Sequence, residues 1–190
     1  FAEKSGSLMY GYFNGEESAE RMLGSGYESP IYTCIIRWGD DPAVVGEEYA
    51  TIYGSYHCMT TPLMTHVLTN ASSSYPELYA SPSCQAVSSM LNTYYKNFLW
   101  SGNPNGGELP QWDAWTSLDG TTQLIVDAND DGAWAEMSTD HISYAEIIER
   151  MEADHSIPDD QKTEMIRTVL NGRWFSGEMD AYYGNEDLWA

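Results

Sequence analysis

Two stretches of the chain have the apolar pattern of β-strands. Residues 31–38 are β-branched or aromatic at both odd and even positions. Such a run is typical of a strand that is covered on both faces inside a parallel sheet, so we predict a central strand here. A shorter apolar run predicts a second strand over residues 123–126.

Helical periodicity is clearest over residues 86–101. Six apolar side chains recur there at helical spacing on one face, namely Val87, Met90, Leu91, Tyr94, Tyr95 and Phe98. Gly102 is placed to cap this helix at its C-terminus, and Pro104 prevents its continuation. Three further segments are predicted to be helical, residues 18–23, 143–153 and 159–171.

The connection between the first strand and the long helix, residues 39–82, has little regular pattern. It begins with an acidic stretch, residues 39–54, and continues through a segment rich in Thr, Ser and Pro. Connections of this length are usually functional or disordered. The tyrosines and methionines in it favour a packed functional loop.

Composition and charge limit the classes of partner. The 190 residues suit one domain, and their hydrophobic content of 42% is enough for a buried core. Eight Lys and Arg residues against 29 Asp and Glu residues give a net charge of −21. Nucleic acid and anionic membrane are therefore not expected as partners, because binding phosphates needs a concentrated basic surface.

Neither a membrane span nor a disulfide framework is indicated. The longest apolar runs, residues 34–36 and 124–126, are far shorter than the ~18 residues of a spanning helix. Cys34, Cys58 and Cys84 allow at most one internal disulfide and lack the spacing of a zinc site, so they do not point to a compartment. The chain starts at Phe1 without a basic and apolar leader, which indicates a processed or cut end.

His57 is the first candidate for chemistry. It follows a Gly and a Ser in the irregular connection, about twenty residues after the predicted central strand. Functional groups of open α/β sheets collect in loops beyond the carboxyl ends of strands, and a general base needs such a position. A surface or packing role is the competing interpretation. His66 is interpreted as a partner in the same loop, and His141 and His155 as solvated or capping residues.

Residues 127–132 are a candidate calcium loop. They match the first half of an EF-hand loop, but the twelfth position is Ser138 instead of a bidentate Glu. The preceding residues are predicted to be a strand instead of a helix. An ordinary turn is therefore the preferred interpretation.

No nucleophile is evident, because the chain contains no Gly-x-Ser-x-Gly elbow. A Cys58–His57 dyad is disfavoured, since adjacent side chains of an extended segment point to opposite sides. Cys34 is predicted to be buried and inert. Several tryptophans are candidates to line an apolar or sugar-binding groove, although core packing is favoured; they are Trp100, Trp112, Trp115, Trp134, Trp174 and Trp189.

Three segments resemble the C-terminal third of type-B carboxylesterases, the cholinesterase-like branch of the α/β-hydrolase fold. Residues 31–38 resemble the final strand before the catalytic histidine, and residues 54–57 resemble the family's Gly-Ala/Ser-x-His segment. Residues 94–105, followed by 109–112, resemble the block W-x-N-F-x-x-x-G-x-P-N…W-P-x-Y. The clearest match covers residues 31–131.

The resemblance implies that residues 1–190 are the C-terminal segment of a single α/β-hydrolase domain, incomplete in this chain, with a mostly parallel central sheet flanked by helices. Residues 132–190 would be its helical C-terminal region. The implied reaction is hydrolysis of a small-molecule ester by a Ser–His–acid triad, with no cofactor and no metal. Only 56 residues precede His57, so the nucleophile, the acid and the oxyanion hole would lie in an upstream part of the same domain.

Within this hypothesis His57 is the catalytic acid and base. Tyr56, Met59 and Met64 would bind substrate, since residues 56–64 would shape the acyl or alcohol pocket. The chain alone would be inactive. The family commonly has an acidic residue three positions after the histidine, where this chain has Thr60, so the pocket wall beside the base differs.

Two other functions stay open. The first alternative is a triad-deficient, cholinesterase-like adhesion or binding module, which the acidic surface and the aromatic C-terminal tail would suit. The second and weaker alternative is a calcium-dependent surface protein built on residues 127–132. An elbow serine in the upstream sequence would favour the enzyme, whereas Gly or Ala at that position would favour the module.

Overall fold

The computed structural model describes residues 1–67, 69–116, 120, 123–171 and 176–185. The fold is mixed α/β and divides into two compact units. One unit is Tyr32–Thr139, and the other combines Phe1–Ile31 with Asp140–Ala190. The prediction that the whole chain belongs to one catalytic domain stays a prediction, and the two units are described separately.

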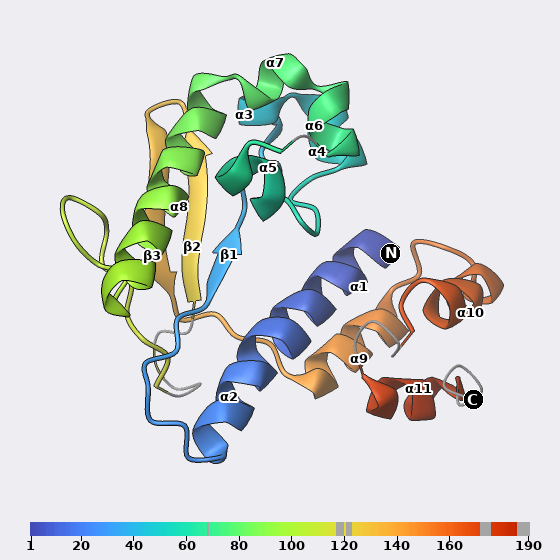
Figure 1. The fold of residues 1–190 in the computed structure, drawn as a ribbon. Helices are drawn as coiled ribbons and strands as arrows, with labels where there is room; N and C mark the ends of the chain where they lie inside the picture. The colour runs from blue at the N-terminus through green and yellow to red at the C-terminus, as the bar shows by residue number, and fades with distance from the viewer. Residues whose placement is uncertain (68, 117–119, 121–122, 172–175, 186–190) are drawn as a thin grey trace. The chain divides into compact units, whose positions relative to one another are not determined.

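The unit Tyr32–Thr139 contains a three-stranded mixed sheet of order β1-β2-β3. β1 (Cys34–Ile36) pairs in parallel with β2 (Gln123–Asn129), and β2 pairs antiparallel with β3 (Gly132–Ser138). Figure 1 shows β1 and β2 pointing the same way, toward a group of short helices. Both predicted strands are confirmed, and the connection between them is a crossover.

Three details of the sheet correct the predictions. β1 is an edge strand among the described residues instead of a central one. The prediction was wrong because apolar residues on both faces indicate that both faces are covered, and they do not indicate how many strands lie alongside. β3 occupies residues 132–138, which were predicted to be helical. The sheet is mixed instead of mostly parallel, with one parallel and one antiparallel pair.

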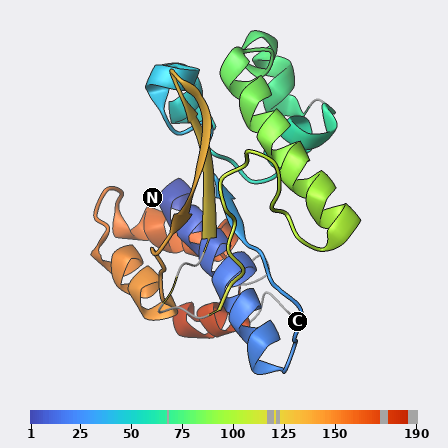
Figure 2. The same cartoon turned by 90° about the vertical axis from the view of Figure 1, so that its left-hand side faces the viewer.

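The long helix α8 (Pro82–Ser101) packs against β2 and β3, and Figure 2 shows it on one face of the sheet. It begins earlier than predicted, because Ser81 caps it by accepting a hydrogen bond from the backbone of Cys84 and Pro82 occupies its first turn. Gly102 ends it in the left-handed conformation, as predicted. Its buried face includes Val87, Leu91 and Tyr94.

The residues after α8 return to the sheet through side-chain hydrogen bonds. The Asn105 side chain makes two hydrogen bonds to the backbone of Trp112: its Oδ1 accepts from the N–H at 2.7 Å, and its Nδ2 donates to the carbonyl oxygen at 2.8 Å. The Trp112 indole donates to the carbonyl oxygen of Thr33 at 3.1 Å, and Tyr94 donates to that of Pro110 at 2.7 Å. Asn105 and Trp112 thus hold this extended segment against the residue that precedes β1.

The connection between β1 and α8 is helical where the sequence predicts an irregular loop. It contains α3 (Pro42–Val45), α4 (Glu47–Ile52), α5 (Thr60–Thr65), α6 (Asn70–Ser74) and α7 (Pro76–Tyr79). These helices are too short for periodicity to identify. The expectation of a packed segment is confirmed, because Tyr49, Leu63 and Tyr79 belong to the buried core of this unit.

The other unit is helical. Its N-terminal part runs from α1 (Ala2–Met9) through a π-helical segment, η1 (Tyr10–Glu16), into α2 (Glu17–Gly24). Only residues 18–23 were predicted, because glycines at 6, 11 and 15 lower the helical propensity of the rest. Packing outweighs that propensity, since Met9 and Phe13 lie in the core of the unit.

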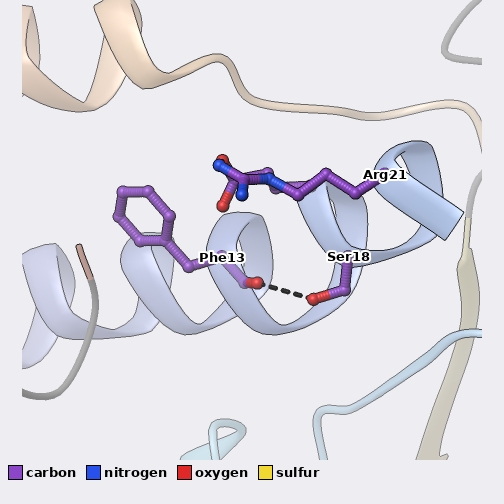
Figure 3. Close-up of polar contacts among 4 residues, drawn as sticks. Phe13, Ser18 and Arg21 are labelled. Atoms are coloured by element: carbon purple, nitrogen blue, oxygen red, sulfur yellow. Dashed lines mark hydrogen bonds and ion pairs between the residues drawn. The ribbon is translucent and has the colours of Figure 1, made fainter. Parts of the chain in front are cut away.

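The wide π-helical turn is closed by a side chain (Figure 3). Ser18 Oγ donates to the carbonyl oxygen of Phe13, five residues earlier, at 2.9 Å. One turn further, Arg21 and Glu17 form an exposed i,i+4 ion pair. Exposed pairs of this kind contribute little to stability. We therefore attribute the stability of this helical segment to the packing of its buried face.

The C-terminal helices are α9 (Tyr144–Ala153), α10 (Asp159–Thr168) and α11 (Gly177–Tyr183). The first two confirm the predictions. Ser143 and Glu146 form a capping box at the start of α9, and the buried Lys162 donates to the carbonyl oxygens of Met151 and Glu152 at its end. Within the described residues, no helix has the length and apolar character needed to cross a membrane.

Candidate active site

His57 lies in a tight turn between α4 and α5. The N–H of Met59 donates to the carbonyl oxygen of Tyr56 at 3.2 Å, which closes a four-residue turn with His57 and Cys58 at its central positions. Cys58 has a φ of 69°, a left-handed conformation at the third position of the turn, as in a type II turn. His57 and Cys58 are both exposed. We call residues 56–59 the histidine turn.

A close approach of two glycines fixes the chain just before the histidine turn. Gly39, which follows β1, has a φ of 117°, and a Cβ atom on it would lie 2.4 Å from the carbonyl oxygen of Gly54. Only a residue without a Cβ atom can occupy this position without displacing the backbone. The segment that leads into His57 therefore lies directly against Gly39, just beyond the end of β1.

Ser55 strengthens this attachment with two hydrogen bonds. Its Oγ donates to the carbonyl oxygen of Trp38 at 3.1 Å, and its N–H donates to Oδ1 of Asp40 at 2.7 Å. Both partners lie just beyond the carboxyl end of β1. Loops at the carboxyl ends of parallel strands are where α/β proteins gather their functional groups, and His57 occupies such a loop.

The three predicted substrate-binding residues lie around the histidine turn in different environments. Tyr56 is half-buried, and its hydroxyl is hydrogen-bonded to Thr69 Oγ1 at 3.0 Å and to the Tyr79 hydroxyl at 3.1 Å. Met59 is 3% exposed and belongs to the core, and Met64 packs against the same core. These contacts give Tyr56 and Met59 packing roles in this chain, and substrate contact by the three residues stays a prediction.

A shallow pocket lies at the C-terminal end of α8. It is lined by Lys96, Asn97, Trp100, Ser101 and Asn105. None of the predicted site residues lines it, so it does not extend the candidate site.

The tryptophans do not form a common groove within the described residues. Trp112 and Trp115 are buried, Trp134 is half-buried and Trp100 is exposed. Trp174 and Trp189 lie outside the described residues. Core packing, the favoured interpretation, is confirmed for Trp112 and Trp115.

A cluster of tyrosines that was not predicted from the sequence lies beside the histidine turn. Tyr49 has its ring centroid 5.5 Å from that of Tyr53 and 5.3 Å from that of Tyr75, and the ring of Tyr53 is 6.0 Å from that of Tyr56. Tyr79 joins them through its hydroxyl, 2.7 Å from that of Tyr49. The spacing of the tyrosines at 49, 53 and 56, and again at 75 and 79, is helical and was the available signal.

Neither Cys34 nor Cys84 is an activated nucleophile. Cys34, Cys58 and Cys84 are all free thiols. Burial raises the pKa of both Cys34 and Cys84 to about 11, which keeps these thiols protonated at neutral pH. Cys34 is half-buried where full burial was predicted, and its raised pKa agrees with the expectation that it is inert.

The remaining histidines are exposed side chains. His66 ends α5 in the left-handed conformation, and His141 and His155 lie next to α9. The exposure of His141 and His155 agrees with their interpretation as solvated or capping residues, and the role of His66 as a partner in the same loop stays a prediction.

The candidate calcium loop forms the β-hairpin between β2 and β3. Asp127 is paired with Trp134 inside the ladder, and Asn129 faces Gly132 across the turn. Burial raises the pKa of Asp127, and the charges of Asp40 and Asp41 add to this effect. The preferred interpretation as a turn is confirmed, and in the described part of the chain no three His, Cys, Asp or Glu side chains are grouped to hold a metal ion.

Backbone strain at Cys58 gives a testable prediction. A residue with a Cβ atom in the left-handed region costs about 1 kcal/mol relative to glycine. We therefore expect Cys58→Gly to be about 1 kcal/mol more stable than Cys58→Ala, because both remove the thiol and only the first removes the strain. Urea denaturation of the two variants measures this difference. Equal stabilities would contradict the strained turn.

No protein-family model, curated protein or solved structure matches the chain.

Proposed function

We propose that this chain is the histidine-bearing part of a serine carboxylesterase similar to the type-B family, with an α/β-hydrolase fold completed by upstream sequence. The observation that supports this most is the position of His57. It sits in a glycine-flanked turn held against the carboxyl end of β1, which runs parallel to β2. The order of parallel strand, histidine turn, long helix and following strand also agrees with the segments that carry the resemblance.

In this proposal His57 works as general base and then as general acid. It takes the proton of an upstream serine while the serine oxygen bonds to the ester carbonyl carbon. It then delivers that proton to the departing alkoxide, and a water molecule repeats the sequence to release the acid. The nucleophile, the acidic triad member and the oxyanion hole are supplied by the upstream part, so the chain alone is expected to be inactive.

The proposal is tested by removing the imidazole in the full-length protein. We expect His57→Ala to lower kcat for p-nitrophenyl acetate by at least about a thousandfold, because a triad base cannot be replaced by its neighbours. His66→Ala is the matched control, since His66 is an exposed histidine of the same connection, and it should retain wild-type activity. Wild-type activity in His57→Ala would overturn the assignment.

A triad-deficient binding module is the second candidate, and the surface of α8 favours it. Leu99 is 79% exposed and Trp100 is 91% exposed, with Tyr95 and Phe98 also exposed nearby. Neighbouring exposed apolar side chains of this size are typical of contact surfaces. The upstream sequence decides between the two candidates, because an elbow serine is needed only by the enzyme.

A further inference from the structure

The hydroxyl groups beside the histidine turn form a chain with Tyr79 at its centre. The Tyr79 hydroxyl lies 2.7 Å from that of Tyr49 and 3.1 Å from that of Tyr56. The Tyr56 hydroxyl is in turn 3.0 Å from Thr69 Oγ1. Tyr79 therefore links a fully buried residue to the first residue of the histidine turn.

Counting the hydroxyl protons shows which tyrosine donates and which accepts in each of these hydrogen bonds. Tyr49 is 1% exposed, and among the described residues Tyr79 is the partner recorded for its hydroxyl. If Tyr49 only accepted, its own buried proton would be unpaired, which is costly. Tyr49 therefore donates to Tyr79, and the single proton of Tyr79 is left for Tyr56.

Tyr56 transmits this bond to the histidine turn. Its carbonyl oxygen accepts the hydrogen bond that closes the turn, from the N–H of Met59. On the preceding side Ser55 is bonded to Trp38. The residue before His57 is thus held by its neighbour, by its own carbonyl group and, through its side chain, by Tyr79.

We propose that Tyr79 is a positioning residue for His57, which fixes the histidine turn by donating a hydrogen bond to Tyr56. Its catalytic consequence depends on the proposed esterase function, whereas its effect on the turn does not. Tyr79 lies 22 residues after His57 in the chain and contributes no atom to the reaction in this proposal.

Three hydroxyl deletions separate this role from simple packing. Tyr79→Phe removes both the acceptor of Tyr49 and the donor to Tyr56. Tyr49→Phe removes a bond to the same hydroxyl but leaves the bond from Tyr79 to Tyr56 intact. Tyr53→Phe is the control within the cluster, since the Tyr53 hydroxyl makes no hydrogen bond to any of the described residues.

The first measurement is hydrogen exchange of backbone amides in the three variants of the chain. We expect Tyr79→Phe to speed exchange in the histidine turn by about tenfold relative to the amides of α8, the effect of one lost buried hydrogen bond. Tyr49→Phe and Tyr53→Phe should leave this ratio within about twofold of wild type. An unchanged ratio in Tyr79→Phe, or equal changes in Tyr79→Phe and Tyr49→Phe, would overturn the positioning role.

The second measurement is ester hydrolysis by the full-length protein. We expect Tyr79→Phe to lower kcat per active site about tenfold or more with KM nearly unchanged, because a misplaced base weakens the transition state more than substrate binding. Wild-type kcat in Tyr79→Phe, with activity lost in His57→Ala, would reject the catalytic consequence alone. Activity retained in His57→Ala would reject the esterase proposal, and the exchange result would still decide the role of Tyr79 in the turn.

Discussion

Replacing Gly39 with alanine is expected to lower the free energy of unfolding by about 3 kcal/mol, since it combines a left-handed backbone with a forced overlap. The new Cβ atom would lie 2.4 Å from the carbonyl oxygen of Gly54, 2.9 Å from its carbon and 3.0 Å from Cε of Met59. The first two contacts are with backbone atoms, which cannot rotate away as a side chain can. The segment that carries His57 must therefore move from the end of β1.

Gly46→Ala is the matched control for this prediction. Gly46 lies in the same connection and has a φ of 85°, but a Cβ atom on it would meet nothing within 4 Å. It should lose only the cost of a positive φ for a residue with a Cβ atom, on the order of 1 kcal/mol. Urea denaturation followed by tryptophan fluorescence measures both losses. Equal losses of unfolding free energy at the two positions would show that the close approach of Gly39 to Gly54 does not make Gly39→Ala more destabilising.

The unit Tyr32–Thr139 is expected to lose stability steeply in alkaline solution, on the order of 5 kcal/mol by pH 11. Burial raises the pKa of Cys34 and Cys84 from 9.0 to about 11. It also raises the pKa of Tyr49 and Tyr94 from 10.0 to about 12. In each case the buried environment disfavours the anion.

The sign of this effect follows from which state releases protons first. The unfolded chain ionises its thiols near pH 9 and its phenols near pH 10, whereas the folded chain holds these protons to higher pH. The stabilisation is therefore fully present below pH 9. It is lost as pH rises toward 12, because the unfolded state then binds fewer protons than the folded state. Urea denaturation at a series of pH values measures the slope.

Cys84→Ala tests whether the slope comes from the buried groups. Cys84 is 2% exposed, so its replacement should lower stability by a constant amount below pH 9. Between pH 9 and pH 11 the variant should lose stability less steeply than wild type, by about 1.4 kcal/mol per pH unit for the missing proton. Parallel slopes in the two proteins would show that burial does not perturb this thiol.

The local residue pattern was sufficient to predict elements that are long enough to show a period and that carry a clear capping or turn signal. The buried residues Val87, Leu91 and Tyr94 of α8 and its Gly102 cap follow from residue types within the segment, although Tyr95 and Phe98 of the predicted face are exposed. The capping box of Ser143 and Glu146 is likewise local. The same is true of the turn at residues 129–132, where acidic and glycine residues interrupt a strand, but not of β3, which was predicted to be helical. The local pattern was insufficient to predict α3–α7, because helices of four to six residues are too short to show a period.

The candidate site was predictable only in part. His57 could be placed after a strand from the sequence, since chain order and the apolar run at 31–38 both report it. Its attachment could not, because the contact of Gly39 with Gly54 and the bond from Tyr79 to Tyr56 join residues that lie 15 and 23 positions apart. Residue patterns reveal which side of an element is buried and do not reveal its partner.

By itself, the sequence determined the acidic charge, two of the three strands, the long helix and the position of one histidine beyond the first strand. The tertiary structure alone decided that β1 is the edge of a mixed sheet and that residues 10–16 form a π-helical turn. It also decided that five tyrosines form one cluster, which includes Tyr56 of the histidine turn. The physical reason is that propensity and periodicity act between neighbours in the chain, whereas strand order and side-chain clusters are selected by packing between distant segments.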